Sequence, residues 1–230
     1  MKRATFIKLY FLLSIIELGA FYPLAWASDT PIEENLAFNV FLGDKLIGNH
    51  EVTIKRDNNK KSVVIRADFD VRFMFIPVYS YNHESREYWK DGCLETIHTT
   101  TDDNGDDYYI NTSLSGDALE IETKDGVKKM QGCVRTFAYW NPELLNSERL
   151  LNTQNGKYQK VSITDLGTAP LTINDFTYQT RQYRLVCEDK TIDLWYSNDR
   201  RWLALETETD SGALLRYLPE QQTIAGLDRL

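Results

Sequence analysis

The chain has 230 residues, a length typical of one or two domains, and its 34 acidic and 26 basic side chains give a formal net charge of −8. An acidic chain without a basic stripe argues against a protein that binds nucleic acid or anionic lipid headgroups. The charge places no limit on a neutral ligand held inside the fold.

The first residues have the features of an export signal. Met1-Lys2-Arg3 is basic, an apolar stretch follows, and Ala25-Trp26-Ala27 matches an A-x-A cleavage site. A membrane anchor is the alternative, but Lys8 and Glu17 leave an apolar run of about 8 residues, fewer than the roughly 20 that span a bilayer. We therefore expect residues 1–27 to be a signal peptide cleaved after Ala27, a periplasmic location, and no transmembrane anchor after cleavage.

Alternating apolar and polar residues dominate the rest of the chain and predict short antiparallel strands joined by tight turns. Gly43-Asp44 and Asp57-Asn58-Asn59 are the first turn signals. Phe73–Val78 is expected to be irregular, because Pro77 cannot donate a hydrogen bond to a central ladder. The expected strands cover residues 38–42, 46–55, 62–71, 88–101, 108–114, 119–124, 158–163, 171–173, 178–187, 191–196, 202–209 and 214–218.

Helix signals are few. Asn141-Pro142-Glu143 combines a cap residue, a first-turn proline and an acid, and predicts a short helix or turn over Leu144–Leu151. About ten to twelve antiparallel strands cannot remain a flat sheet. We predict a mainly β protein: a single curved antiparallel sheet, half-barrel or barrel, with one short helix. Residues 28–230 should form a single β-rich domain with its core at about 33–220.

The segment from Tyr79 to Trp89 is the most informative for function. If it is a strand, its alternate residues share one face, and rings with a histidine and a carboxylate on one face are typical of a ligand-pocket wall. The alternative is a buried aromatic ladder whose histidine bonds to a backbone carbonyl. The candidate binding residues are Tyr79, Tyr81, His83, Glu87 and Trp89, with Tyr139 and Trp140 at a mouth and His50 at a rim.

No catalytic or metal motif is complete. His83-Glu84 lacks the second histidine of a metalloprotease helix, since Glu87 occupies that position. A calcium loop that begins at Asp102 would need glycine and glutamate where Asp107 and Ser113 stand, so an acidic hairpin turn is expected there. We expect neither a metal nor a cofactor. An enzyme would have to use His83 as a general base, oriented by Glu84 or Glu87.

Cys93, Cys133 and Cys187 all follow the expected cleavage site. An oxidising compartment would favour one disulfide with one thiol left over, and three pairings are open. Three buried thiols are an equal alternative, because each cysteine lies in or beside an apolar run.

An ordered set of motifs resembles a family of uncharacterised bacterial exported proteins, domain of unknown function 6134 (DUF6134). The set comprises Phe38–His50, Tyr81-Asn82-His83-Glu84, Glu87–Leu94, Phe137–Pro142, Leu150-Leu151-Asn152, Leu194-Trp195-Tyr196 and Trp202 with Leu205. The chain departs from the pattern at Gly43-Asp44, where Asp-Gly is expected, and at Asn49, where an aromatic residue is usual. The resemblance implies an envelope location but no activity. A more distant likeness to exported half-barrel lipoprotein carriers is a fold analogy alone.

We therefore expect an exported, non-enzymatic periplasmic protein that binds an apolar or lipid-like molecule in its curved sheet. The first alternative is an envelope enzyme of the hydrolase type that uses His83. The second is a structural or assembly partner in the envelope, which would have an exposed apolar patch and no cavity.

Overall fold

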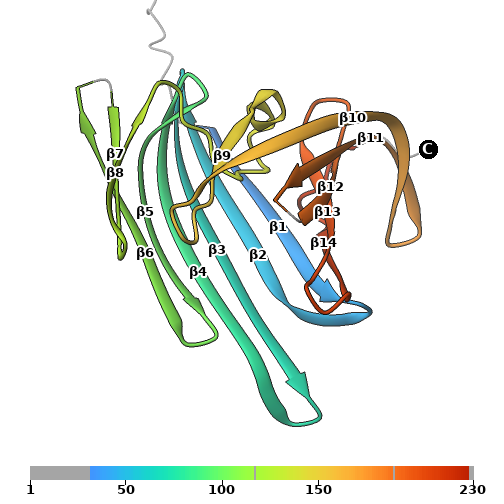
Figure 1. Cartoon of the computed structure of the whole chain (residues 1–230). Helices are drawn as coiled ribbons and strands as arrows, with labels where there is room; N and C mark the ends of the chain where they lie inside the picture. Colours follow the sequence, from blue (N-terminus) through green and yellow to red (C-terminus); the bar gives the residue numbers. More distant parts are fainter. Residues whose placement is uncertain (1–31, 117, 189, 228–230) are drawn as a thin grey trace, which may run out of the picture.

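The computed structural model of the chain describes residues 32–116, 118–188 and 190–227, so the expected signal peptide and its cleavage site lie outside the described residues. The described chain forms one 14-stranded antiparallel sheet in the order β8-β7-β6-β5-β4-β3-β2-β1-β14-β13-β12-β11-β10-β9. The sheet curves around a concave inner face and does not close, since β8 and β9 are its two outer strands (Figure 1). The predicted curved antiparallel sheet is therefore confirmed.

Two meanders build this sheet and meet at a central seam between β1 and β14, where Phe38 to Leu42 pair with Pro219 to Leu215. The strands are β1 (Ile32–Leu42), β2 (Lys45–Asp57), β3 (Lys60–Phe73), β4 (Ile76–Lys90), β5 (Cys93–Asp103), β6 (Asp106–Ser115), β7 (Ala118–Thr123), β8 (Gly126–Gln131), β9 (Arg149–Leu151), β10 (Tyr158–Ile173), β11 (Phe176–Cys187), β12 (Lys190–Tyr196), β13 (Trp202–Glu208) and β14 (Leu214–Pro219). Tight turns at Gly43-Asp44 and at Asn58-Asn59 join β1 to β2 and β2 to β3, as the first turn signals predicted.

The strand count is 14, higher than the predicted ten to twelve. β8 was missed because it is an exposed edge strand in which Met130 alone is buried, so its sequence does not alternate. The predicted strands 158–163 and 171–173 are one continuous strand, β10, whose register shifts at a bulge between Asp165 and Gly167. The extra residue of the bulge interrupts the alternation of apolar and polar residues but not the strand.

The predicted helix is shorter than expected. A single 3₁₀ turn, η1 (Pro142–Asn146), follows the Asn141 cap, whose side chain accepts a hydrogen bond from the Glu143 amide. The predicted short helix or turn does not extend to Leu151, because Leu150 and Leu151 are fully buried in β9 and pair with β10.

The expectation that residues 73–78 are irregular was also wrong in part. β4 begins at Ile76 and includes Pro77, which pairs with Arg72 beyond a register shift between Val71 and Arg72. The proline is tolerated because the pairing of β4 with β5 starts only at Tyr81, so no ladder partner on that side needs its amide.

The segment between β8 and β9, residues 132–148, crosses the concave face and is called the inner segment below. A disulfide joins Cys93 to Cys133 with a Cα–Cα distance of 5.0 Å, and the Leu94 amide donates to the Val134 carbonyl at 2.9 Å. The Trp140 ring packs edge-on against Trp89 at 5.4 Å between centroids. The inner segment therefore completes the main hydrophobic core, which strands from both meanders share.

Of the pairings that the sequence left open, the structure contains Cys93–Cys133, and Cys187 is buried at the end of β11. In the described part of the chain, no helix is long and apolar enough to cross a membrane.

Candidate functional site

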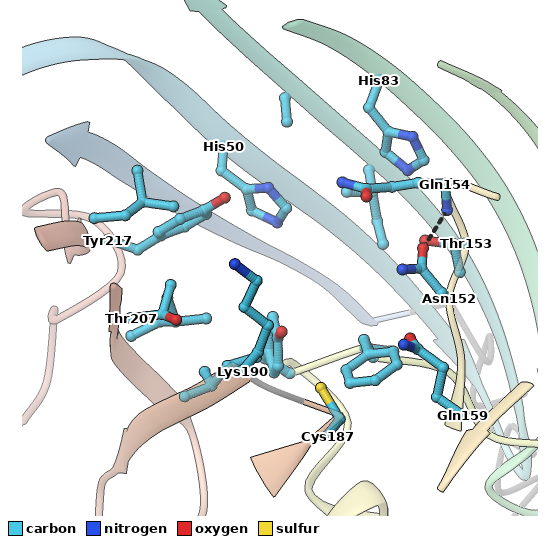
Figure 2. A pocket seen from close by; sticks show the side chains of 18 of the residues that line it. His50, His83, Asn152, Thr153, Gln154, Gln159, Cys187, Lys190, Thr207 and Tyr217 are labelled. Atoms are coloured by element: carbon cyan, nitrogen blue, oxygen red, sulfur yellow. Dashed lines mark hydrogen bonds between the residues drawn. The ribbon is translucent and has the colours of Figure 1, made fainter. Parts of the chain in front are cut away.

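A cavity of about 640 Å³ lies on the concave side of the sheet, between its two meanders. One wall comes from β2, β3 and β4, the opposite wall from β11 to β14, and the inner segment and the loop after β9 close the remaining sides. Figure 2 shows His50 and His83 on the first wall and Lys190 and Tyr217 on the opposite one. The lining residues include Ile65, Ala67, Tyr81, Phe137, Tyr139, Trp140, Asn152, Gln154, Ile192, Trp202 and Leu215.

The predicted alternation along β4 is confirmed, because Tyr81, His83, Glu87 and Trp89 are all buried on the inner face while their neighbours face outward. The structure nevertheless places only some of the candidate binding residues at the cavity. Among the candidate binding residues, Tyr81, His83, Tyr139, Trp140 and His50 line the cavity.

The remaining candidates are placed elsewhere. Glu87 and Trp89 lie deeper in the core, where Trp140 covers Trp89. Tyr79 lies beyond the cavity in a second apolar cluster, and its hydroxyl donates to Asp103 at 2.8 Å. The buried-ladder alternative therefore describes the β4 residues on either side of the cavity.

His50 and His83 lie in one cross-strand row, since His50 pairs with Ala67 and Ala67 pairs with His83. The small Ala67 side chain leaves a notch between the two rings, and all three residues line the cavity. His83 Nδ1 forms a hydrogen bond of 2.8 Å with the hydroxyl of Thr101, not with a backbone carbonyl. His50 Nδ1 is buried and has no hydrogen-bond partner among the described residues. A ligand in the notch could supply that partner.

The imidazoles in the notch are neutral at physiological pH. Burial, reinforced by the neighbouring His83, lowers the pKa of His50 from 6.5 to about 3. Burial also lowers the pKa of His83 from 6.5 to about 4. Burial raises the pKa of the Tyr81 and Tyr217 hydroxyls above their usual value, which keeps both protonated. The two histidines and the two tyrosines therefore offer hydrogen bonds to a ligand without formal charge.

The enzyme alternative required a carboxylate to orient His83, and the described residues make no such contact. Glu84 faces outward, where it pairs with Arg86 and, at 3.8 Å, with Arg66. Glu87 accepts hydrogen bonds from Trp89 Nε1 at 2.7 Å and from the Ser85 hydroxyl at 3.1 Å. Burial raises the pKa of Glu87 from 4.5 to about 7, which these hydrogen bonds oppose.

Several lining residues could not be found from the sequence. The loop after β9 contributes Asn152 and Gln154, and the Gln154 amide donates to the Tyr81 hydroxyl. Lys190, paired with Asp210, lines the opposite wall together with Tyr217. Lys190 and Tyr217 face the first wall because β14 pairs with β1. Local periodicity in the sequence cannot predict this long-range pairing.

Metal ligation has no support within the described residues, where no group of three or more His, Cys, Asp or Glu side chains could hold an ion. The acidic run after Asp102 forms the predicted hairpin turn, in which the Gly105 amide donates to Asp102 Oδ1 at 2.7 Å.

The fold and the cavity define a β-barrel-like domain, built from one unclosed sheet around an internal segment. The chain belongs to the family described as Domain of unknown function (DUF6134), whose model matches residues 38–220. The resemblance drawn from the motifs is thereby confirmed.

The structure is similar to the crystal structure of a β-barrel-like protein of Domain of Unknown Function DUF1849 from Brucella abortus, with a TM-score of 0.62 and 9% sequence identity. The similarity covers 87% of this chain and 98% of that one. At this identity the likeness shows the fold alone. The comparison with curated proteins finds no match.

Proposed function

We propose that this protein is exported to the periplasm and binds an amphipathic, lipid-like molecule in the cavity between its two meanders. The observation that carries the proposal is a cavity of about 640 Å³ lined mainly by large rings, aliphatic groups and uncharged hydrogen-bonding side chains. The charged residues Lys157, Glu188, Lys190 and Asp210 also belong to the lining. Small-molecule pockets of roughly 300–1,000 Å³ with this mixture are typical binding sites.

The distribution of the lining favours a ligand with unlike ends. The His50–Ala67–His83 notch can form hydrogen bonds to a hydroxyl, carbonyl or amide group of a ligand. Phe137 and Trp140 of the inner segment, together with Ile192, provide apolar contact for a hydrocarbon portion. An entirely apolar ligand would leave His50 Nδ1 unsatisfied, which is costly for a buried polar atom.

Export is supported by two independent features. The N-terminal sequence has a basic start, an apolar stretch and the cleavage motif that ends at Ala27. The Cys93–Cys133 disulfide fits an oxidising compartment, because cytosolic thiols are normally kept reduced.

Native mass spectrometry of the protein recovered from the cells that express it tests the proposal. We expect a species with a defined mass excess that organic solvent extracts. The Ala67→Leu variant fills the notch and should lose the added mass. The matched control is Arg66→Leu, which introduces the same side chain at the neighbouring outward-facing position and should retain the added mass.

Far-ultraviolet circular dichroism verifies that both variants fold. If Ala67→Leu does not fold, Ile192→Trp blocks the half-buried opposite wall instead. A bare wild-type mass, or equal occupancy in the blocked and control variants, would contradict binding in this cavity.

A further inference from the structure

The turn between β3 and β4 carries an exposed group of apolar side chains, called the apolar tip below. Met74, Phe75, Ile76 and Val78 are exposed to 80%, 94%, 66% and 53%. The tip projects past its neighbours, because the β2–β3 ladder ends at the pair Gly48–Phe69 and the β4–β5 ladder starts at Tyr81–Asp103. Figure 1 shows this hairpin reaching beyond the other turns at the same end of the sheet.

The residues of the tip are not the types that favour a tight turn. Other tight turns of this sheet use the residues that favour positive φ, such as Gly43-Asp44, Asn58-Asn59 and Asn104-Gly105. Met74 instead adopts a φ of 56°, a conformation that non-glycine residues other than Asn and Asp rarely take. Apolar residues at a strained, solvent-facing turn indicate a role in contact with another phase or molecule.

The geometry favours a lipid surface over a protein partner. The tip is exposed on both faces and at its apex, whereas a folded partner would cover one side. Addition of a partner strand to the open edges is hindered, because Pro77 has no amide hydrogen and the Arg72 carbonyl already accepts from Lys45 Nζ. Residues 73–82 contain no charged side chain, and Arg72 at the base is neutralised by Asp70 at 2.6 Å.

We propose that the apolar tip docks the protein on a lipid bilayer by inserting Met74 and Phe75 into the outer part of one leaflet. Insertion is shallow, because the unpaired backbone groups along the ribbon edges cannot be satisfied in the hydrocarbon core. The half-buried Tyr79 lies at the base of the tip, at the depth where tyrosine rings favour the membrane interface.

A buried apolar cluster connects the base of the tip with the cavity. The second cluster includes Val71 and Tyr79 near the tip, then Phe69 and Tyr81, and it reaches Tyr217 on the opposite wall. Tyr81 and Tyr217 also line the cavity. In a docked protein this buried cluster would therefore lie between the bilayer and the cavity, although docking itself does not require a bound ligand.

Flotation with phosphatidylcholine vesicles tests the docking. The Met74→Asn/Phe75→Gly double variant removes the apolar apex and installs a favourable turn pair, so folding should be retained. We expect it to lower the vesicle partition coefficient by at least about tenfold relative to wild type. The control is Val127→Asn on β8, where a 60% exposed valine lies outside the tip and partitioning should be unchanged.

Hydrogen exchange locates the contact in the full chain. Vesicles should slow amide exchange in peptides that cover residues 70–80 of wild type and should leave this region of the double variant unaffected. Vesicles with added phosphatidylglycerol should bind no more strongly, since the tip is uncharged and the chain carries a net charge of −8.

Absent flotation of wild type, full flotation of the double variant, or protection confined to other segments would overturn the docking. The mass excess in native mass spectrometry should persist in the double variant. If Ala67→Leu loses the ligand but still floats with vesicles, the result bears on ligand binding in the cavity and not on docking. The two proposals can therefore fail separately.

Discussion

His50 and His83 face the same cavity from two strands that a third strand separates, with Ala67 between them in register. The burial that places both imidazoles there also lowers the pKa of His50 to about 3 and that of His83 to about 4. The arrangement ties the stability of the fold to pH.

Acid should destabilise the protein through these two histidines. The unfolded chain takes up protons at a pKa near 6.5, while the folded chain does so only near 3 and 4, so protons favour unfolding in the interval between. The free energy of unfolding should be fully retained above pH 6.5 and fall by on the order of 1 kcal/mol per pH unit for each histidine as the pH drops toward 4. Urea unfolding followed by tryptophan fluorescence measures it. His50→Gln and His83→Gln should each flatten the slope; unchanged slopes in both would contradict the assignment.

Glu87 should act in the opposite direction. Its pKa is raised from 4.5 to about 7 by burial, so the contribution of its protonated form is present below pH 4.5 and is lost as the pH rises through 7. Glu87→Gln, which keeps an acceptor for Trp89 Nε1, should have little effect at pH 4 and raise the free energy of unfolding by roughly 1–3 kcal/mol at pH 8. A difference between variant and wild type that stays constant from pH 4 to 8 would argue against this titration.

The disulfide should stabilise the inner segment against opening. Cys93 and Cys133 are 40 residues apart in sequence, and a loop of this size predicts a loss of about 2–4 kcal/mol in the Cys93→Ser/Cys133→Ser variant. Urea unfolding gives the magnitude, and hydrogen exchange should show faster exchange over the inner segment. Dithiothreitol should lower the stability of wild type and leave the double variant unchanged, which separates the disulfide from other effects of the two serines.

Gly48 should be intolerant of any side chain. A Cβ atom placed there would lie 1.9 Å from the Asp68 carbonyl oxygen on β3, so Gly48→Ala must separate β2 from β3 locally. We expect a loss of more than about 2 kcal/mol in the free energy of unfolding. Gly43→Ala is the control, since its Cβ meets no atom within 4 Å and only the φ of 59° opposes it. Its cost should be about 1 kcal/mol, and equal losses at both sites would contradict the close contact.

The sequence predicts local features of this fold well because they depend on short-range chemistry. Alternation from Tyr81 to Trp89 correctly assigned the inner face of β4, and Asn141 correctly marked the start of η1. The interruption in β10 was misjudged, because Gly167 belongs to a bulge that leaves the strand continuous.

The site could be predicted only in part because it combines distant segments. His50, Tyr81 and His83 were identified from strands with clear alternation, whereas Lys190 and Tyr217 face them through the β1–β14 pairing. The disulfide partner of Cys93 depends on the path of the inner segment across the concave face, which no sequence spacing specifies.

The seam between β1 and β14 has a consequence for biogenesis. Phe38 to Leu42 find their hydrogen-bond partners on one side only when residues 215–219 are available. In a chain that crosses a membrane amino end first, β1 therefore emerges long before β14. During that interval β1 is an open edge, which is the state most prone to pair with other chains. If the protein is exported as we propose, completion of the sheet should follow release of the whole polypeptide, and chaperones that bind unpaired strands should act on it mainly before its last strand has emerged.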